Sequence, residues 1–541
     1  MYRKVEQARL AAEDFELPFG GKLAEDNRWV ILAQLIPWAE FESEYAQNFE
    51  AEVGPRAKSF RLALGALIIK EKLGVSDRET VEQIRENPYL QYFIGQSSYR
   101  NEIPFDASLL VHFRQRISAQ LVNKVNREVV RRLREATRSD SEKKNEESEP
   151  PLNQGKLILD ATCAPADISY PTDLKLLNQA RVHTEKIIDV LYEQVKGEIQ
   201  QKPRTCRRIA RKDYLKVAKK RQPSRKQKRK AIKKQIQYLR RNLSHIEQLI
   251  ELGASLTSLA KRQYKMLLVV SEVYRQQLWL FKNNKQSIED RIVSLSQPQI
   301  RPLVRGKAGK PVEFGAKLSA SCFEGYAFLD RISWDNFNES RDFKAQIEAY
   351  RDFTGFYPES VHVDKIYRTR ENRAWCKERG IRISGPPLGR PPAHVSREQK
   401  KQALEDEKIR NAIEGKFGLL KRRFSLERVM AKLTNTSQTT IAITFLVINL
   451  STALRRFFCV FLCPLAKTTL VFGLFIIKRY QSAKKRKYSL MFLSAGVNNS
   501  SLFGSPFTYS ASPNYDDRLH KCLHTAKTNT SDRSVHHACD A

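Results

Sequence analysis

The spacing of apolar residues predicts helices over the first part of the chain. FRLALGALIIKEKLG (60–74) repeats apolar residues every three or four positions and ends on a glycine, as an amphipathic helix does. SDRETVEQIRENP (76–88) opens with Ser76 and carries Glu79 three residues later, the pattern of an N-terminal capping box. DASLLVHFRQRI (106–117) again separates apolar from basic positions. We therefore predict an all-α N-terminal domain over residues 1–137, which is either a DNA-contacting bundle or an ordinary helical domain.

Apolar runs of strand length follow, and two of them lead into an aspartate. Leu157–Leu159 run directly into Asp160, and ESVHVDKIY (359–367) places Asp364 after a second short apolar run. Short apolar runs of this kind are typical of buried strands. Each aspartate is therefore expected at the end of a strand, where the sheet would hold its carboxylate rigidly.

A β-hairpin, one more strand and a long helix complete the pattern. Apolar runs between residues 312 and 335 flank the pair Glu324–Gly325, and IRISGPP (381–387) predicts a short strand stopped by prolines. SREQKKQALEDEKIRNAIEGKF (396–417) starts a helix with a capping box of Ser396 and Gln399. Strands and helices in this order predict a mixed α/β sheet.

A basic helical segment separates the first strand from the hairpin. Residues 202–241 contain 19 lysines and arginines and a single acid. Apolar residues in steps of four and three run from 232 to 250 and again from 264 to 281, on either side of Gly253. We predict an antiparallel helical hairpin inside an insertion at about 174–300. Such a run is often only a solvated face, but the excess of cations favours a DNA-binding arm that uses Lys226, Lys228, Arg229 and Lys230.

The chain as a whole is strongly basic. Its 541 residues include 95 lysines and arginines against 60 aspartates and glutamates, a formal net charge of +35. This imbalance favours a polyanionic partner, most often nucleic acid, over an anionic lipid surface. Eight cysteines without a CxxC pair, and no apolar signal segment at the start, predict reduced thiols in a cytoplasmic protein. HKCLH and HHAC near the C-terminus leave a zinc site open as a minor alternative.

Two segments suggest domain boundaries. RSDSEKKNEESEPPLNQG (138–155) is charged and contains prolines, which predicts a linker between the N-terminal domain and a catalytic domain at 156–455. FFCVFLCPLAKTTLVFGLFII (457–477) is apolar enough to raise the question of a membrane helix, but Pro464 and Lys467 interrupt it, and we expect no membrane. Residues 456–541 are predicted to be this apolar segment followed by a disordered tail.

Three carboxylates form the candidate catalytic set: Asp160, Asp364 and Glu414. Phosphodiester cleavage by two divalent metals needs hard oxygen ligands and few other protein groups. Glu414 stands in the basic stretch RNAIEGKFGLLKRRF (410–424), where an acid makes sense if metal ions supply its countercharge and the nearby cations hold DNA phosphates. From spacing alone the three could equally be unrelated acids. Two other acids are rivals for the same role, Asp167 and Asp330.

The motifs around these acids resemble a known family. Arg410, Glu414 and Lys421, separated by three and six residues, resemble the signature around the catalytic glutamate of prokaryotic insertion-sequence DDE transposases, specifically the insertion-sequence-five family. Asp364 with Tyr367 three residues later is similar to the second-aspartate motif, and LILDAT resembles the first. The segments FRLALGALIIKEKLGVSDRETVEQIRENPYLQYFIG and PFDASLLVHFRQRI resemble the family's N-terminal domain. The resemblance covers roughly residues 45–455; where the family often has a tyrosine before the arginine, this chain has Glu407.

The resemblance implies a ribonuclease-H-like catalytic core in which Asp160, Asp364 and Glu414 bind two Mg²⁺ ions, with Mn²⁺ as a substitute. Arg410, Lys421 and Tyr367 would contact DNA near the site. The implied activity is to bind the terminal inverted repeats of an insertion sequence, cleave the DNA and join the 3′-OH ends to target DNA by transesterification. The implied partners are double-stranded DNA, as repeat ends and as target, and further copies of the chain in a dimer or higher synaptic complex. The expected location is the prokaryotic cytoplasm, on the nucleoid. The alternative is a catalytically inactive DNA-binding protein, the remnant of such an element.

Overall fold

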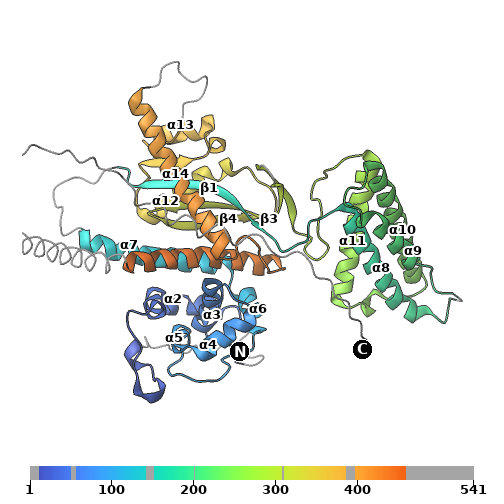
Figure 1. Ribbon diagram of the computed structural model, residues 1–541, viewed down its shortest axis with the longest axis horizontal. Helices are drawn as coiled ribbons and strands as arrows, with labels where there is room; N and C mark the ends of the chain where they lie inside the picture. The colour runs from blue at the N-terminus through green and yellow to red at the C-terminus, as the bar shows by residue number, and fades with distance from the viewer. Residues whose placement is uncertain are drawn as a thin grey trace, which may run out of the picture. The chain divides into compact units, whose positions relative to one another are not determined.

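The computed structural model describes residues 11–49, 56–141, 152–199, 201–307, 310–385 and 396–458. They form a helical N-terminal region, a mixed β-sheet with helices against it, and a helical insertion between the first two strands (Figure 1). The prediction of a mixed α/β protein with a helical N-terminal region is thereby confirmed. The predicted domain boundaries stay predictions. The tail, with the HKCLH and HHAC motifs and most of the apolar segment at 457–477, lies outside the described residues.

Seven α-helices build the N-terminal region. They are α1 (Arg28–Leu35), α2 (Trp38–Ala46), α3 (Phe60–Leu73), α4 (Asp77–Glu86), α5 (Pro88–Phe93), α6 (Leu109–Arg116) and α7 (Ala119–Ser141). Two turns of 3₁₀-helix, Ala12–Asp14 and Pro18–Gly20, precede them. Gly74 ends α3 with a left-handed φ of 71°, and the Ser76 hydroxyl accepts the Glu79 N–H at 3.1 Å to cap α4. Both predicted helix ends are therefore confirmed.

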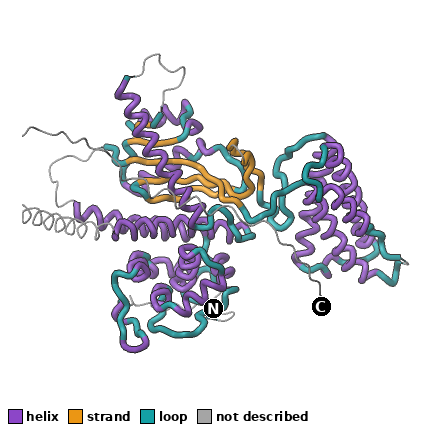
Figure 2. The backbone as a smooth tube through the Cα atoms, in the orientation of Figure 1, coloured by secondary structure: helices purple, strands orange, loops and turns teal. Residues whose placement is uncertain are grey.

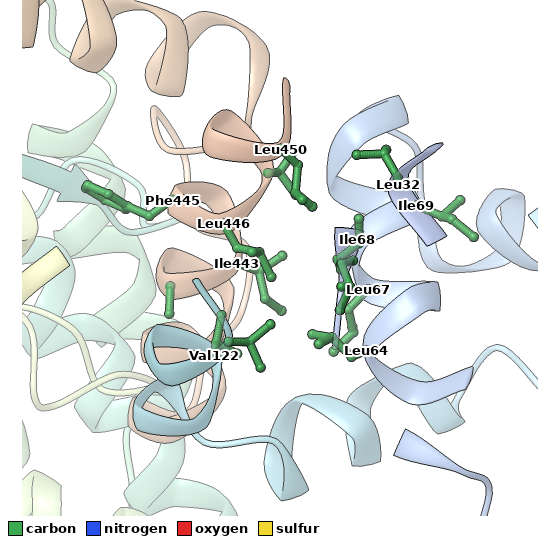
Figure 3. Close-up of a cluster of buried hydrophobic side chains, with 14 of the residues drawn as sticks. Leu32, Leu64, Leu67, Ile68, Ile69, Val122, Ile443, Phe445, Leu446 and Leu450 are labelled. Atoms are coloured by element: carbon green, nitrogen blue, oxygen red, sulfur yellow. The ribbon is translucent and has the colours of Figure 1, made fainter. Parts of the chain in front are cut away.

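The N-terminal helices share one apolar core with the helix Thr434–Phe458 near the end of the described chain. Figure 3 shows Leu64 and Ile68 of α3 facing Ile443 and Leu446 of that helix, and all four are buried. Burying each such side chain contributes about 1.5–3 kcal/mol relative to exposure. Among the described residues, this helix is also the one long and apolar enough to cross a membrane, but 72% of its most apolar window is buried within the protein. Packing in the core accounts for its composition.

The sheet has six strands. They are β1 (Lys156–Pro165), β2 (Arg301–Lys307), β3 (Lys310–Phe323), β4 (Tyr326–Ser333), β5 (Ser360–Val363) and β6 (Arg382–Ile383). The long strand β3 pairs antiparallel with β1 along one side and with β2 and β4 along the other. On its far side β1 pairs parallel with β5, and β5 pairs parallel with β6. An antiparallel meander is thus joined through β1 to two parallel strands.

Sequence explains most of these strands. The predicted hairpin is confirmed, since Glu324 and Gly325 join β3 to β4 with φ values of 49° and 73°, the left-handed pair that a tight hairpin turn requires. The prediction that Asp160 ends its strand is wrong, because β1 continues through ATCAP to Pro165. What ends beside Asp160 is the pairing with β5, whose last partners are Leu159 and Val363.

Each face of the sheet carries its own helices. One face presents Ile158 and Ala320 to α14 (Arg397–Arg423) and the helix Thr434–Phe458. The opposite face presents Leu159 and Val363 to α12 (Phe343–Thr354) and neighbouring segments. Because side chains alternate along a strand, Asp160 belongs to the face of Ile158, the α14 face. α14 begins with the predicted capping box, formed by Ser396 and Gln399.

The insertion is a helical bundle larger than the predicted hairpin (Figure 2). It contains α8 (Asp173–Val195), α9 (Arg207–Ala218), α10 (Arg225–Glu251) and α11 (Lys261–Asn283). α8 packs against both α10 and α11, with Leu177 and Leu191 buried in its two apolar clusters. The predicted pair of α10 and α11 is therefore present, but as part of a bundle. At its base, the Gln297 side chain donates to the Asp167 carbonyl at 3.5 Å, so the two ends of the insertion lie side by side.

Candidate active site

The pairing of β1 with β5 brings two predicted acids together. Leu159 lies opposite Val363 in the parallel register, and Asp160 and Asp364 are the next residue on each strand. Adjacent strands are about 4.8 Å apart, so the two residues are neighbours although far apart in the chain. Burial, with a smaller contribution from the Asp364 carboxylate, raises the pKa of Asp160 to about 6. The sheet therefore places one partly buried acid beside one exposed acid.

The third predicted acid comes from α14, which packs on both β1 and β5 (Figure 1). The Arg410 guanidinium bonds to the Asp364 carboxylate at 2.8 Å and to the Glu414 carboxylate at 3.0 Å. These acids are about half exposed, at 52% and 55%, whereas the Arg410 side chain is only 14% exposed. Arg410 also counteracts the rise in the pKa of Asp160. We call Asp160, Asp364 and Glu414, gathered about Arg410, the carboxylate site.

Arg410 is held by three acids in all. Glu407, which stands where the related family often has tyrosine, bonds to it at 2.7 Å. Together these carboxylates raise the pKa of Arg410, with the hydrogen bond that Arg410 donates to Glu407 as the largest cause. The acid at this position thus contacts the arginine directly.

An ion pair with a buried acid fixes α14 on the sheet one turn before Arg410. Asp406 is buried and accepts two hydrogen bonds from Arg382 of β6, at 2.8 and 2.9 Å. Its carboxylate also lies 3.6 Å from the His362 imidazole of β5. Burial raises the pKa of Asp406, but the Arg382 and Gln402 hydrogen bonds outweigh it and leave the pKa lowered. Residues 406, 410 and 414 follow one another at four-residue spacing, so anchoring the first positions the other two.

Sequence reasoning missed this anchor and one further acid. Glu339, in the 3₁₀ turn Glu339–Arg341, raises the pKa of Asp160 and bonds to Lys317 at 3.0 Å. The four-residue spacing on α14 was a usable signal for Asp406. Nothing in the sequence near Glu339 marks it, because its position depends on how the loop after β4 folds back.

The rival acids have other surroundings. Asp330 accepts hydrogen bonds from Ser321 and from Gln346 of α12, which covers the face of the sheet opposite the carboxylate site. Asp167 lies beyond β1 and pairs with Arg428 at 2.5 Å. The structure brings neither of them to Asp364.

The predicted DNA contacts have different degrees of exposure. Tyr367 is fully buried, and its ring packs 6.3 Å from that of Phe343. Burial raises the pKa of its phenol, and the acids Glu339 and Asp160 add to the rise. In this structure Tyr367 is a core residue, so a direct contact with DNA would require it to move. Lys421 follows Glu414 by seven residues, about 10 Å along the same side of α14.

The carboxylates of this site suit a hard divalent cation, although the described side chains are not grouped to hold one. Carboxylate oxygens are the ligands that Mg²⁺ prefers. Within the described segments, no three His, Cys, Asp or Glu side chains are grouped closely enough to hold a metal ion. Instead the Arg410 guanidinium supplies a positive charge between Asp364 and Glu414. The chemistry of the residues fits a metal, provided that Arg410 gives up these carboxylates.

These features define a class: a mixed α/β protein with carboxylates gathered on one face of its sheet. Comparison with known proteins identifies the family. Residues 361–451, which include Asp364 and Glu414, match a family described as a transposase DDE domain. Residues 18–116 match one described as a transposase domain (DUF772). The chain belongs to the DDE-family transposases of insertion sequences.

One curated relative is an uncharacterized protein, ORF8 in the nfe locus of Rhizobium meliloti. It is 34% identical over 151 residues, which make up 28% of this chain and 68% of that protein. No solved structure matches the chain.

Proposed function

We propose that this transposase cleaves DNA at the terminal inverted repeats of its element with two divalent metals. It then joins the freed 3′-OH ends to target DNA by transesterification. The observation that carries the proposal is the register that makes Asp160 and Asp364 neighbours, with Glu414 linked to Asp364 through Arg410. The order of the sheet, a meander joined through β1 to two parallel strands, supports a ribonuclease-H-like core. The motif spacing supports a place in the insertion-sequence-five family.

In this proposal the residues of the chain have separate roles. Asp160, Asp364 and Glu414 hold the metals, Mg²⁺ or in its place Mn²⁺. Bound metals would activate a water or 3′-hydroxyl and stabilise the leaving oxygen. Arg410 leaves Asp364 and Glu414 and, with Lys421, contacts DNA phosphate. The protein works on double-stranded DNA as a dimer or larger complex, because two ends must be processed together, and it acts in the cytoplasm.

The test makes the same change, aspartate to asparagine, at one position on each face of the sheet. Asp364→Asn keeps the shape of the side chain but removes a charged ligand, so Mg²⁺-dependent cleavage of end-bearing DNA should fall roughly a thousandfold or more. Asp330→Asn makes the same change on the opposite face and should retain cleavage within a few-fold. Both variants should bind end DNA like the wild type in a gel-shift assay.

Two outcomes would contradict the proposal. If Asp364→Asn cleaves normally while Asp330→Asn does not, the metal site is assigned to the wrong face. If the wild-type protein binds the ends but cuts no DNA with Mg²⁺ or Mn²⁺, the chain is the alternative, a DNA-binding remnant without catalytic activity.

A further inference from the structure

The helix α9 of the insertion carries cations along its outer side. Arg208, Arg211, Lys212, Lys216 and Lys219 are all exposed, and they surround a shallow hollow on the surface of the helix. The last four stand three, four, eight and eleven residues after Arg208, which puts all five on one side of the helix. We call these five residues the α9 stripe.

The opposite side of α9 faces the bundle and contains its acid. Ala210 is buried, and its carbonyl accepts a hydrogen bond from Gln235 of α10 at 3.0 Å. Asp213 accepts hydrogen bonds from Lys234 and Tyr238, also of α10, at 3.0 and 2.9 Å. The carboxylate therefore bonds mainly to α10, and of the α9 stripe it reaches only Lys216, at 4.0 Å.

Like charges one turn apart destabilise a helix. The α9 stripe contains two such pairs, Arg208 with Lys212 and Lys212 with Lys216, and Asp213, the acid of α9, reaches only Lys216 among them. Helices with solvated faces usually mix the two signs of charge, as α7 does where Arg131 pairs with both Glu128 and Glu135. A stripe of cations alone weakens its own helix through repulsion. A bound polyanion that covers the stripe would offset this repulsion and so explains why the stripe is there.

We infer that the α9 stripe binds the phosphate backbone of duplex DNA during transposition. The inference rests on the proposed function for the identity of the polyanion and adds the surface that holds it. From Arg208 to Lys219 the helix rises about 16 Å, a length over which one DNA strand presents roughly five phosphates. Contacts to phosphate carry no sequence information, so the α9 stripe holds element ends and target DNA alike.

One cation of the DNA-binding arm predicted from sequence, Arg229, differs from the α9 stripe because it contacts other parts of the bundle. Arg229 of α10 lies 4.4 Å from the centre of the Phe281 ring and donates to Asn284 at 2.9 Å. Arg207, which precedes the α9 stripe, pairs with Asp189 of α8. These two arginines hold the bundle together, whereas the five residues of the α9 stripe face solvent.

The experiment removes three charges from the α9 stripe in the full-length chain. The variant carries Arg211→Gln, Lys212→Gln and Lys216→Gln. A matched control removes three exposed charges elsewhere in the bundle, by Arg240→Gln, Lys261→Gln and Lys265→Gln. DNA affinity is measured by fluorescence anisotropy over a range of salt concentrations, with end-bearing and scrambled duplexes, and folding is checked by circular dichroism.

We expect the first variant to bind both duplexes at least tenfold more weakly at low salt. Its slope of log affinity against log salt should fall by roughly 2.7, about 0.9 for each lost phosphate contact. The control should change the slope by less than about 1. Equal slopes for the variant and the control would overturn the inference and leave the proposed function standing. A wild-type protein that binds neither duplex would overturn both, and so would tighter binding to anionic vesicles than to DNA.

Discussion

The carboxylate site and the α9 stripe carry opposite charges, and the fold assembles them in different ways. At the carboxylate site, acids from β1, from the end of β5 and from α14 gather around Arg410. On the α9 stripe, cations gather on one helix whose acid, Asp213, bonds mainly to α10 and reaches only Lys216 of the stripe. The first arrangement needs three elements to be placed correctly, and the second needs only one helix. A catalytic site needs side chains from several elements to meet at one point, whereas a surface that binds a long polymer needs the same kind of side chain repeated along one element.

The comparison predicts that the carboxylate site depends strongly on its distant anchor. Asp406→Ala removes the partner of Arg382 and His362, so α14 loses its fixed position on the sheet. Cleavage should fall by about a hundredfold, since misplacement by 1 Å has effects of that size. Stability should fall by about 1–3 kcal/mol, less than for a fully buried pair because the Arg382 side chain is 42% exposed.

Chemical denaturation and single-turnover cleavage measure the two effects for Asp406→Ala. Glu405→Ala, at the neighbouring exposed position, is the control. A variant that loses stability but cleaves at the wild-type rate would show that the anchor does not position the site.

A buried acid outside both regions tests whether a raised pKa by itself marks function. Burial raises the pKa of Glu71 in α3 to about 7, close to the value for Asp160, but its charged neighbours are the cations Lys70 and Arg114. The folded state therefore keeps the Glu71 proton up to about pH 7, whereas the unfolded chain releases it near pH 4.5. Between these values the folded state binds more protons, so stability falls as pH rises.

Glu71→Gln should remove this loss and raise the free energy of unfolding at pH 8 by about 3 kcal/mol, with little change at pH 4. Cleavage should be unchanged. Urea unfolding at the two pH values gives the answer, and a variant with equal effects at both would show that Glu71 does not titrate in this way.

The carboxylate site should bind metal more tightly without its own cation. Arg410→Gln removes the positive charge that Asp364 and Glu414 share, so Mg²⁺ no longer competes with it. The Mg²⁺ concentration needed to raise the melting temperature should fall roughly two- to fivefold, the modest effect expected for exposed carboxylates. Lys408→Gln, an exposed position on α14, is the control. An unchanged midpoint would mean that Arg410 does not compete with metal.

The smallest effect separates two neighbouring cations of the predicted arm. Arg229→Gln loses its contact with the Phe281 ring and should reduce stability by about 0.5–1 kcal/mol. Lys226→Gln should leave stability within about 0.5 kcal/mol, because its side chain is exposed at the start of α10. If Lys226 contacts DNA, its variant lowers the salt slope by about 0.9. Identical behaviour of the two variants in both assays would remove the distinction between a bundle contact and a DNA contact.

How far sequence alone could reach differs between these regions. The helices of the N-terminal region, the hairpin at Glu324–Gly325 and the cap of α14 follow from local patterns, and the structure has them. The length of β1 did not follow, because its last residues pair with β3, a partner that the local sequence does not reveal. The bundle was underestimated for a similar reason, since α8 buries its apolar side against segments that come later in the chain.

The same division applies to the carboxylate site. The three acids were proposed from motifs, and the structure gathers them around Arg410, but their catalytic roles stay predictions. Glu339 and the ion pair of Asp406 with Arg382 depend on loops and on strand order, which spacing does not show. A sequence motif can mark the residues proposed to act on the substrate, but it seldom marks the residues that hold them in place.

The closing contact between Gln297 and Asp167 has a consequence for how this chain can change. These residues are 130 positions apart, yet their atoms meet at 3.5 Å. Because the ends of the insertion meet, the entropy cost of closing it into the sheet is nearly the same whether it is long or short. The cost of closing a loop grows only with the logarithm of its length. Insertions with adjoining ends are also the ones that domains tolerate best. The bundle should therefore be replaceable: with a short glycine linker in its place, the sheet and carboxylate site should still assemble, while DNA binding should weaken because α9 is absent.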